Sequence, residues 1–206
     1  MSGLYRGIAI GVVLCVAAGS ASAQQASEDV QQAALAPPSA SECLQTPAPD
    51  LNQRIKACTA AIDSGQLRGR ERPMAYLARA AAYTASGDMA RATIDNGHAV
   101  VALSAIMDPE APDPNLLFLR ATTYHALGDA DPALADYNLA IRLSPFSPIA
   151  FIDRGILLTA YKQQYMLAIM DFDRALELAP GNPDALAHRA EAVAARAALQ
   201  ARQQRD

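Results

Sequence analysis

A pattern of large and small side chains recurs along this chain with a period of about 34 residues, and it limits what the chain can fold into. One copy runs through Leu117, Ala121, Tyr124, Ala133, Tyr137, Ala140 and Pro145, and the next through Phe151, Gly155, Leu158, Ala168, Phe172, Ala175 and Pro180. These apolar positions follow helical spacing within each half of a copy. A unit of this kind cannot bury its own apolar face, so the copies must stack on one another.

The unit length and the order of large, small and large residues resemble the tetratricopeptide-repeat family. The resemblance covers about residues 50–196 and includes a weaker copy around Tyr76, Ala80 and Tyr83, in which Asn96 takes the usual aromatic place. It implies an all-α, right-handed superhelical solenoid of helical hairpins with a C-terminal capping helix. In that family the first helix of each pair lines a concave binding surface, and the chain also resembles the small exported repeat proteins of Gram-negative bacteria.

The first 23 residues have the pattern of a secretory leader. Arg6 precedes an apolar run over 7–19, and Ala21-Ser22-Ala23 fits a small-residue cleavage site. The run is shorter than the roughly 20 residues of a membrane span. We expect cleavage before Gln24 and a periplasmic location, with an uncleaved anchor or lipid attachment at Cys15 as the alternatives.

The remaining chain divides by composition and by the repeat. We expect a disordered linker over 24–40, a partial repeat over 41–72, three repeats over 73–112, 113–147 and 148–181, and a capping helix and tail over 182–206. The expected helices of the three repeats are 73–86 and 89–106, 114–127 and 132–143, and 148–161 and 165–178. Asp50 is expected to cap a helix in the partial repeat, and 68–72 to form a loop.

Two cysteines remain once the leader is set aside. In an oxidising compartment, Cys43 and Cys58 are expected to form a disulfide that fastens the non-repetitive start of the fold to the solenoid. Two free thiols are the alternative, while a redox pair would more typically be a Cys-x-x-Cys at a helix start.

An arginine precedes the small residue of each first helix, and an aspartate occupies a matching place in each second helix. The pairs are Arg79 with Asp95, Arg120 with Asp136, and Arg154 with Asp171, at separations of 16, 16 and 17 residues. We predict structural ion pairs across each hairpin, because the planar guanidinium suits a partly buried carboxylate. The alternative is a ladder of arginines for an acidic ligand.

The resemblance also implies which side chains face the concave surface. Counting one, five and eight residues beyond Tyr76, Leu117 and Phe151 selects Leu77, Ala81, Thr84, Phe118, Thr122, His125, Ile152, Ile156 and Thr159. This set is apolar with a few hydroxyls, so it does not favour the carboxylate grip of some family members and instead suits an amphipathic partner helix. The alternative occupants are the protein's own tail or a second copy of the chain.

Charge and motifs exclude several function classes. Removing residues 1–23 deletes Arg6 and leaves 16 basic against 21 acidic side chains, a net charge of −5, which does not favour nucleic acid or an anionic membrane. No phosphate-binding glycine loop, G-x-S-x-G elbow or HExxH occurs, and His98, His125 and His188 stand apart from metal-ligand patterns. We therefore expect no catalytic activity, no cofactor and no metal.

The expected function is protein–protein interaction in the periplasm through the apolar concave surface. Two alternatives are a chaperone or assembly factor that holds an exported client transiently, and an architectural subunit of an envelope complex. Self-association of the chain is left open.

Overall fold

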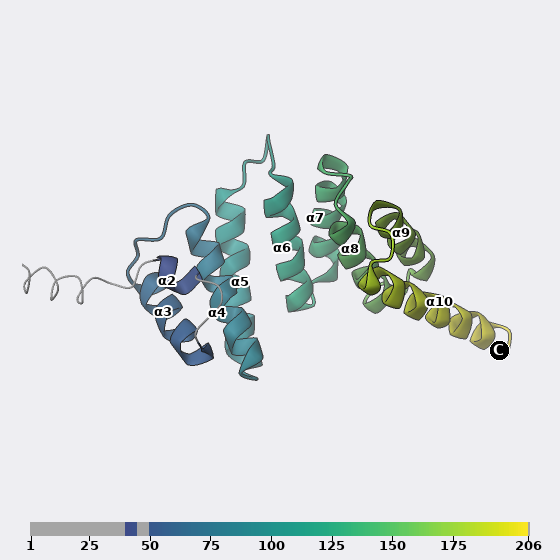
Figure 1. Ribbon diagram of the computed structural model, residues 1–206, viewed down its shortest axis with the longest axis horizontal. Helices are drawn as coiled ribbons and strands as arrows, with labels where there is room; N and C mark the ends of the chain where they lie inside the picture. The colour runs from purple at the N-terminus through teal and green to yellow at the C-terminus, as the bar shows by residue number, and fades with distance from the viewer. Residues whose placement is uncertain (1–39, 45–49, 206) are drawn as a thin grey trace, which may run out of the picture.

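The computed structural model describes residues 40–44 and 50–205. The expected leader and nearly all of the expected linker lie outside these residues. The described part of the chain is helical and contains no strand. Its helices follow one another along the long axis of the molecule, with α2 and α3 near one end and α10 at the other (Figure 1).

Three helical hairpins form the body of the fold. They are α4 (Glu71–Ala85) with α5 (Met89–Ile106), α6 (Pro114–Leu127) with α7 (Ala130–Leu143), and α8 (Pro148–Ala160) with α9 (Tyr165–Leu178). The boundaries differ from the expected ones in small ways. Helix α4 begins at Glu71, inside the stretch expected to be a loop, and α7 begins two residues before Pro132. The all-α solenoid predicted from the 34-residue period is confirmed.

Side-chain caps and glycines define the helix ends. Asp50 accepts a hydrogen bond from the Gln53 amide, as predicted, and Asp88 accepts one from the Arg91 amide. Gly128 ends α6 in the left-handed conformation with φ of 81°. At the corresponding turn of the third hairpin, Gln163 takes the left-handed conformation with φ of 51°. The third hairpin has one more residue between its arginine and its aspartate than the second hairpin has. A non-glycine residue in a strained backbone conformation accommodates this residue in the turn.

Close packing of the two helices in each hairpin explains the small residues of the pattern. Ala121 and Ala133 are fully buried around Tyr137, and Ala168 and Ala175 are fully buried around Phe172. Gly155 shows the limit of this packing, because a Cβ placed there would lie 2.7 Å from the Phe172 ring. The large residues need small partners so that the helices can approach one another.

The N-terminal end of the solenoid is closed by α2 (Ala40–Leu44) and α3 (Leu51–Asp63). Helix α2 packs against both α3 and α4. A disulfide joins Cys43 of α2 to Cys58 of α3, and both cysteines are fully buried. The disulfide expected from the sequence is present, and it fixes α2 to the start of the solenoid.

The C-terminal end is formed by α10 (Pro183–Gln203), which packs against α9 and α8. Among residues 40–44 and 50–205 no following helix completes a hairpin with it. Ala185 and Ala192 are fully buried on the side of α10 that packs against the rest of the solenoid. Helix α10 is thus held firmly on one side and open on another.

Candidate interaction surface

The predicted Arg–Asp pairs are formed in all three hairpins. Each arginine uses Nε and Nη2 to donate to the two carboxylate oxygens of its partner, at 2.8 and 2.8 Å for Arg79–Asp95, 2.7 and 2.8 Å for Arg120–Asp136, and 2.8 and 2.6 Å for Arg154–Asp171. The aspartates are only 2%, 7% and 5% exposed. These charges are therefore satisfied by bidentate pairing rather than by water.

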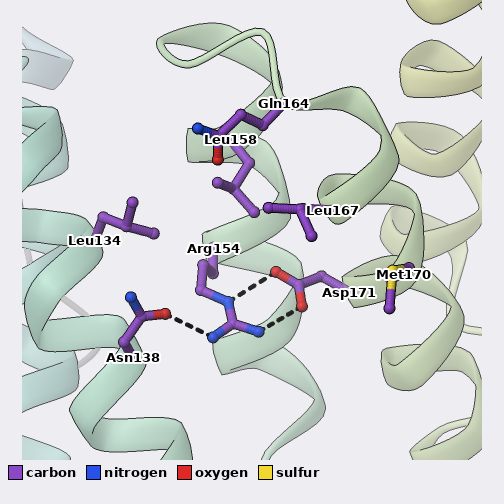
Figure 2. A pocket seen from close by; sticks show the side chains of 8 residues that line it. All are labelled: Leu134, Asn138, Arg154, Leu158, Gln164, Leu167, Met170 and Asp171. Atoms are coloured by element: carbon purple, nitrogen blue, oxygen red, sulfur yellow. Dashed lines mark hydrogen bonds and ion pairs between the residues drawn. The ribbon is translucent and has the colours of Figure 1, made fainter.

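The third nitrogen of each arginine reaches the preceding hairpin, a contact that the sequence did not predict. Nη1 donates to Thr59, Ser104 and Asn138 respectively, at 2.9, 2.9 and 2.7 Å. Figure 2 shows this arrangement at Arg154, which lies between Asp171 and Asn138. Each arginine thus joins three helices from two successive hairpins.

The electrostatics agree with this geometry. The hydrogen bonds that Arg79 donates to Asp95 raise the pKa of Arg79, and those that Arg120 donates to Asp136 raise the pKa of Arg120, each against the opposing effect of burial. The guanidinium donors are engaged within the fold, which favours the structural interpretation over a ladder for an acidic ligand.

A cavity of about 260 Å³ opens above the Arg154 network, between the second and third hairpins. Its lining consists of Leu134, Asn138, Arg154, Leu158, Gln164, Leu167, Met170 and Asp171 (Figure 2). The polar groups at its floor are already bonded to one another, so the cavity offers mainly apolar contact.

The nine side chains predicted to line the concave surface lie on α4, α6 and α8, the first helices of the hairpins. We call the side of these helices that carries the nine residues the first-helix face. On α4, Ala81 and Thr84 are exposed and Leu77 is half-buried. On α6 and α8, Phe118, Thr122, His125, Ile156 and Thr159 are half-buried. The face is thus most open on α4.

The prediction needs correction at Ile152. This side chain is only 6% exposed and belongs to a core cluster against which Phe118 and Ile156 pack. Because α6 and α8 contact each other directly, their apolar side chains cover one another at mid-helix. Ile152 packs in the core beneath the first-helix face and has almost no surface that a partner could contact.

One exposed apolar residue extends the same stripe but was missed from the sequence. Ile149 precedes Ile152 by three positions on α8 and is 54% exposed. Helical spacing places Ile149, Ile152 and Ile156 on one side of α8, so extending the spacing backwards from Ile152 would have found Ile149. Phe146, which is 75% exposed, lies in the turn before α8.

His125 lies at the end of α6, where its ring meets the edge of Tyr161 with centroids 5.6 Å apart. Partial burial lowers the pKa of His125, so its neutral form is favoured in the fold. The other two histidines also stack on aromatic rings, His98 on Tyr76 and His188 on Phe172. These contacts explain the histidines as packing residues.

A second feature that the sequence did not reveal is the environment of Asp153 on α8. Burial raises the pKa of this carboxyl to about 6, and the nearby His188 opposes the shift. Close by, Tyr137 is fully buried, and its hydroxyl has no hydrogen-bond partner among the described residues. Burial, together with the Asp153 charge, raises the pKa of Tyr137.

No group of three or more His, Cys, Asp or Glu side chains in the described ranges is placed to hold a metal ion. Over the same ranges no helix combines the length and apolar character required to cross a bilayer.

The hairpins stack on one another, and this defines a helical-repeat solenoid. A buried ion pair joins the two helices of each hairpin, and its arginine also bonds the preceding unit. Residues 114–147, which span α6 and α7, match the family model of the tetratricopeptide repeat. This match, together with the stacked hairpins, gives the described part of the chain the solenoid fold of tetratricopeptide-repeat proteins.

Solved structures agree with this assignment. A tetratricopeptide repeat protein from Parabacteroides merdae is 25% identical, with a TM-score of 0.52 over 71% of this chain and 54% of its own. The present chain therefore spans little more than half of that protein. The MamA protein has the same fold at 13% identity, with a TM-score of 0.50 over 71% of this chain and 74% of its own.

The first TPR of Spaghetti (RPAP3), solved bound to an HSP90 peptide, is 26% identical, with a TM-score of 0.46 over 64% of this chain and 97% of its own. None of the curated proteins matches the chain by sequence.

Proposed function

We propose that this protein is an exported scaffold that binds an apolar, helical segment of another protein on its first-helix face. The observation that carries the proposal is Ile149, 54% exposed on the same side of α8 as the half-buried Ile156, against whose core cluster Phe118 also packs. Burying one such side chain in a complex contributes about 1.5–3 kcal/mol. Apolar side chains spaced along one side of a helix are the arrangement that an amphipathic helix uses when it lies in a groove.

The chemistry of the face favours an apolar partner over an acidic one. The nine predicted residues include no lysine or arginine, and the neighbouring arginines of the ladder donate to Asp95, Asp136 and Asp171 instead. A carboxylate-gripping mode would require free cationic donors, so spaced hydrophobic anchors are the better match.

The test is photocrosslinking in cells from position 149, with a matched probe at Met170. Met170 is 61% exposed on α9, so it is as accessible as Ile149 but lies on a second helix. We expect one foreign protein to crosslink from position 149 and to be lost in an Ile149→Asp variant, while Met170→Asp leaves it unchanged. Equal crosslinking from both positions would contradict a specific first-helix site.

The same experiment separates the two other functions open to this surface. A chaperone or assembly factor would crosslink to many clients with exposed apolar segments and release them readily. An architectural subunit would instead copurify with one partner at a fixed ratio. The present proposal is a specific scaffold and predicts a single dominant partner.

Export to the periplasm is part of the proposal and rests on two observations. Residues 1–23 have the composition of a cleavable leader, and the buried Cys43–Cys58 disulfide suits an oxidising compartment. Mass spectrometry of the protein from its host should find an N-terminus at Gln24 and no free thiol. Retention of residues 1–23 would contradict cleavage, and a reduced cysteine pair would contradict an oxidising location.

A further inference from the structure

Helix α10 has the sequence of a first helix, and within residues 50–205 no following helix covers it. Counting along the repeat places Leu186, Ala190 and Val193 where Leu117, Ala121 and Tyr124 stand in α6. In α6 the second helix covers this face, and Leu117 is 1% exposed. In α10, Leu186 is 50% exposed and Val193 is 43% exposed. We call the side of α10 that carries Leu186, Ala190 and Val193 the open face.

A charged group at the open face is also only half engaged. Arg189 occupies the same repeat position as Arg120 and Arg154, and it reaches the preceding hairpin as they do, by donating Nε to Asp173 at 2.5 Å. The earlier arginines also bond a carboxylate on their own hairpin. Arg189 has none within the described ranges, and 42% of its side chain is exposed, against 20% for Arg154.

These features specify the chemistry of the missing helix. In α7 and α9 the residues that cover the first helix follow one pattern. A small residue is followed three positions later by an aspartate, then directly by a large aromatic residue, and three positions after that by a second small residue. The two examples are Ala133, Asp136, Tyr137 and Ala140, and Ala168, Asp171, Phe172 and Ala175. The small residues allow close approach, the large one fills the gap, and the aspartate pairs with the arginine.

The net charge of the C-terminal end adds little to this specification. Residues 183–206 carry four arginines against Asp184, Glu191 and Asp206, so their net charge is +1 with histidine neutral. The local requirement is an aspartate opposite Arg189.

The chain itself contains a segment with the required spacing, in which valine stands where α7 and α9 carry tyrosine or phenylalanine. Ala26, Asp29, Val30 and Ala33 repeat the spacing of the second helices, and residues 24–35 carry two acidic and no basic side chains. This segment lies outside the described residues and precedes α2. We propose that residues 26–33 of a second copy of this chain bind as a helix on the open face of α10, with Asp29 pairing with Arg189.

Geometry requires a second copy. Only residues 34–39 separate the segment from α2, and six extended residues span at most about 22 Å. Figure 1 shows α2 and α10 at opposite ends of the molecule, with three hairpins between them. Packed helices lie about 8–10 Å apart, so three hairpins exceed this reach. A contact from the N-terminal segment of one copy to the C-terminal helix of the next is heterologous, and it builds rings or open chains.

The test is a charge exchange in the full chain, followed by sedimentation velocity over a range of protein concentrations. We expect the unchanged protein to assemble with rising concentration, and either Asp29→Arg or Arg189→Asp to weaken assembly at least tenfold. The double exchange should restore assembly, because the pair is re-formed with the charges reversed. Glu28→Arg and Arg202→Asp are the matched controls, which change the same charges at neighbouring positions and should leave assembly intact.

Two outcomes would overturn the proposal. One is a protein that stays monomeric at all concentrations, and the other is assembly that survives both single exchanges. Loss of assembly in Ile149→Asp but not in Asp29→Arg would place self-association on the first-helix face instead. If circular dichroism shows that Arg189→Asp disturbs the fold, Leu186→Ser and Asp29→Arg replace it, since Leu186 is already exposed. Each of these two variants should weaken assembly, and assembly that survives both would overturn the proposal.

Discussion

The second and third hairpins follow the same repeat but meet its demands with different residues. In the second hairpin, Ala121 faces Tyr137 and Gly128 ends the first helix. In the third, Gly155 faces Phe172 and Gln163 takes the left-handed position of the turn. Both hairpins retain the arginine pair with the same bidentate geometry. The comparison shows that the buried ion pair is the constant feature, whereas the turn and the helix contact are adjustable.

Breaking the ion pair should have the largest effect, and a similar one in both hairpins. Asp136→Ala or Asp171→Ala leaves a guanidinium largely buried without its carboxylate, and such losses cost about 3–5 kcal/mol of stability. Chemical unfolding measures the change. Glu177→Ala is the control, because its pair with Arg174 is exposed and contributes at most about 1 kcal/mol. An unchanged midpoint for Asp136→Ala would refute the structural role of the ladder.

Exchanging the small residues should distinguish the two hairpins. Gly155→Ala places a methyl group 2.7 Å from the Phe172 ring, and overpacking of this kind costs about 1–3 kcal/mol. Thermal unfolding checks the loss. The double variant Gly155→Ala with Phe172→Leu should recover part of the lost stability. If Gly155→Ala alone and the double variant are equally stable, the Phe172 ring moves aside without cost.

Removing the Tyr137 hydroxyl should give the second hairpin the all-apolar packing that Phe172 provides in the third. The Tyr137 hydroxyl is buried without a partner, whereas Phe172 fills the equivalent place with a ring alone. Tyr137→Phe is expected to stabilise the protein by about 1 kcal/mol, because an unpaired buried polar group is removed. A loss of stability would mean that the hydroxyl has a partner in solution.

The Asp153 carboxyl makes the seam between these hairpins sensitive to pH. Its folded pKa of about 6 lies above its ordinary value of 3.8, so the folded state holds the proton more tightly than the unfolded state. Stability from this group is therefore full below pH 4 and is lost as the pH rises through 6. Asp153→Asn should remove this slope and raise the melting temperature at pH 7. The lowered pKa of His125 acts with the opposite sign below pH 6.5, so His125→Gln in both backgrounds isolates the Asp153 contribution.

The turn should give the smallest difference. Gln163→Gly relieves a left-handed backbone at a non-glycine residue, and we expect a gain of about 0.5–1 kcal/mol. Gly128→Gln is the reciprocal change and should cost a similar amount. If both variants match the unchanged protein, the turn adjusts its backbone without strain.

The two ends of the solenoid extend the comparison. The N-terminal end is closed by α2 and a disulfide, and the C-terminal helix leaves Leu186 and Val193 exposed. The described chain is thus covered at one end and exposes apolar side chains at the other, and the proposed end-to-end contact between copies rests on this difference.

The sequence by itself determined the hairpins, the disulfide partners and the Arg–Asp pairs. The hairpins and the Arg–Asp pairs depend on spacing within one unit, because helical periodicity makes side chains at such separations meet. The disulfide followed from the two cysteines that remain after the leader and from an oxidising compartment. The residue types also carry the information, because Gly, Ala and the large apolar residues recur at positions where only one size fits.

Only the tertiary structure decided what lies between units. The third bond of each arginine, to Thr59, Ser104 or Asn138, depends on how one hairpin rests on the next. The burial of Ile152 and the environment of Asp153 have the same origin, since a neighbouring helix covers both. Local periodicity states which side of a helix is apolar, but the rotation and offset of the next hairpin decide which of those residues remain open to a partner.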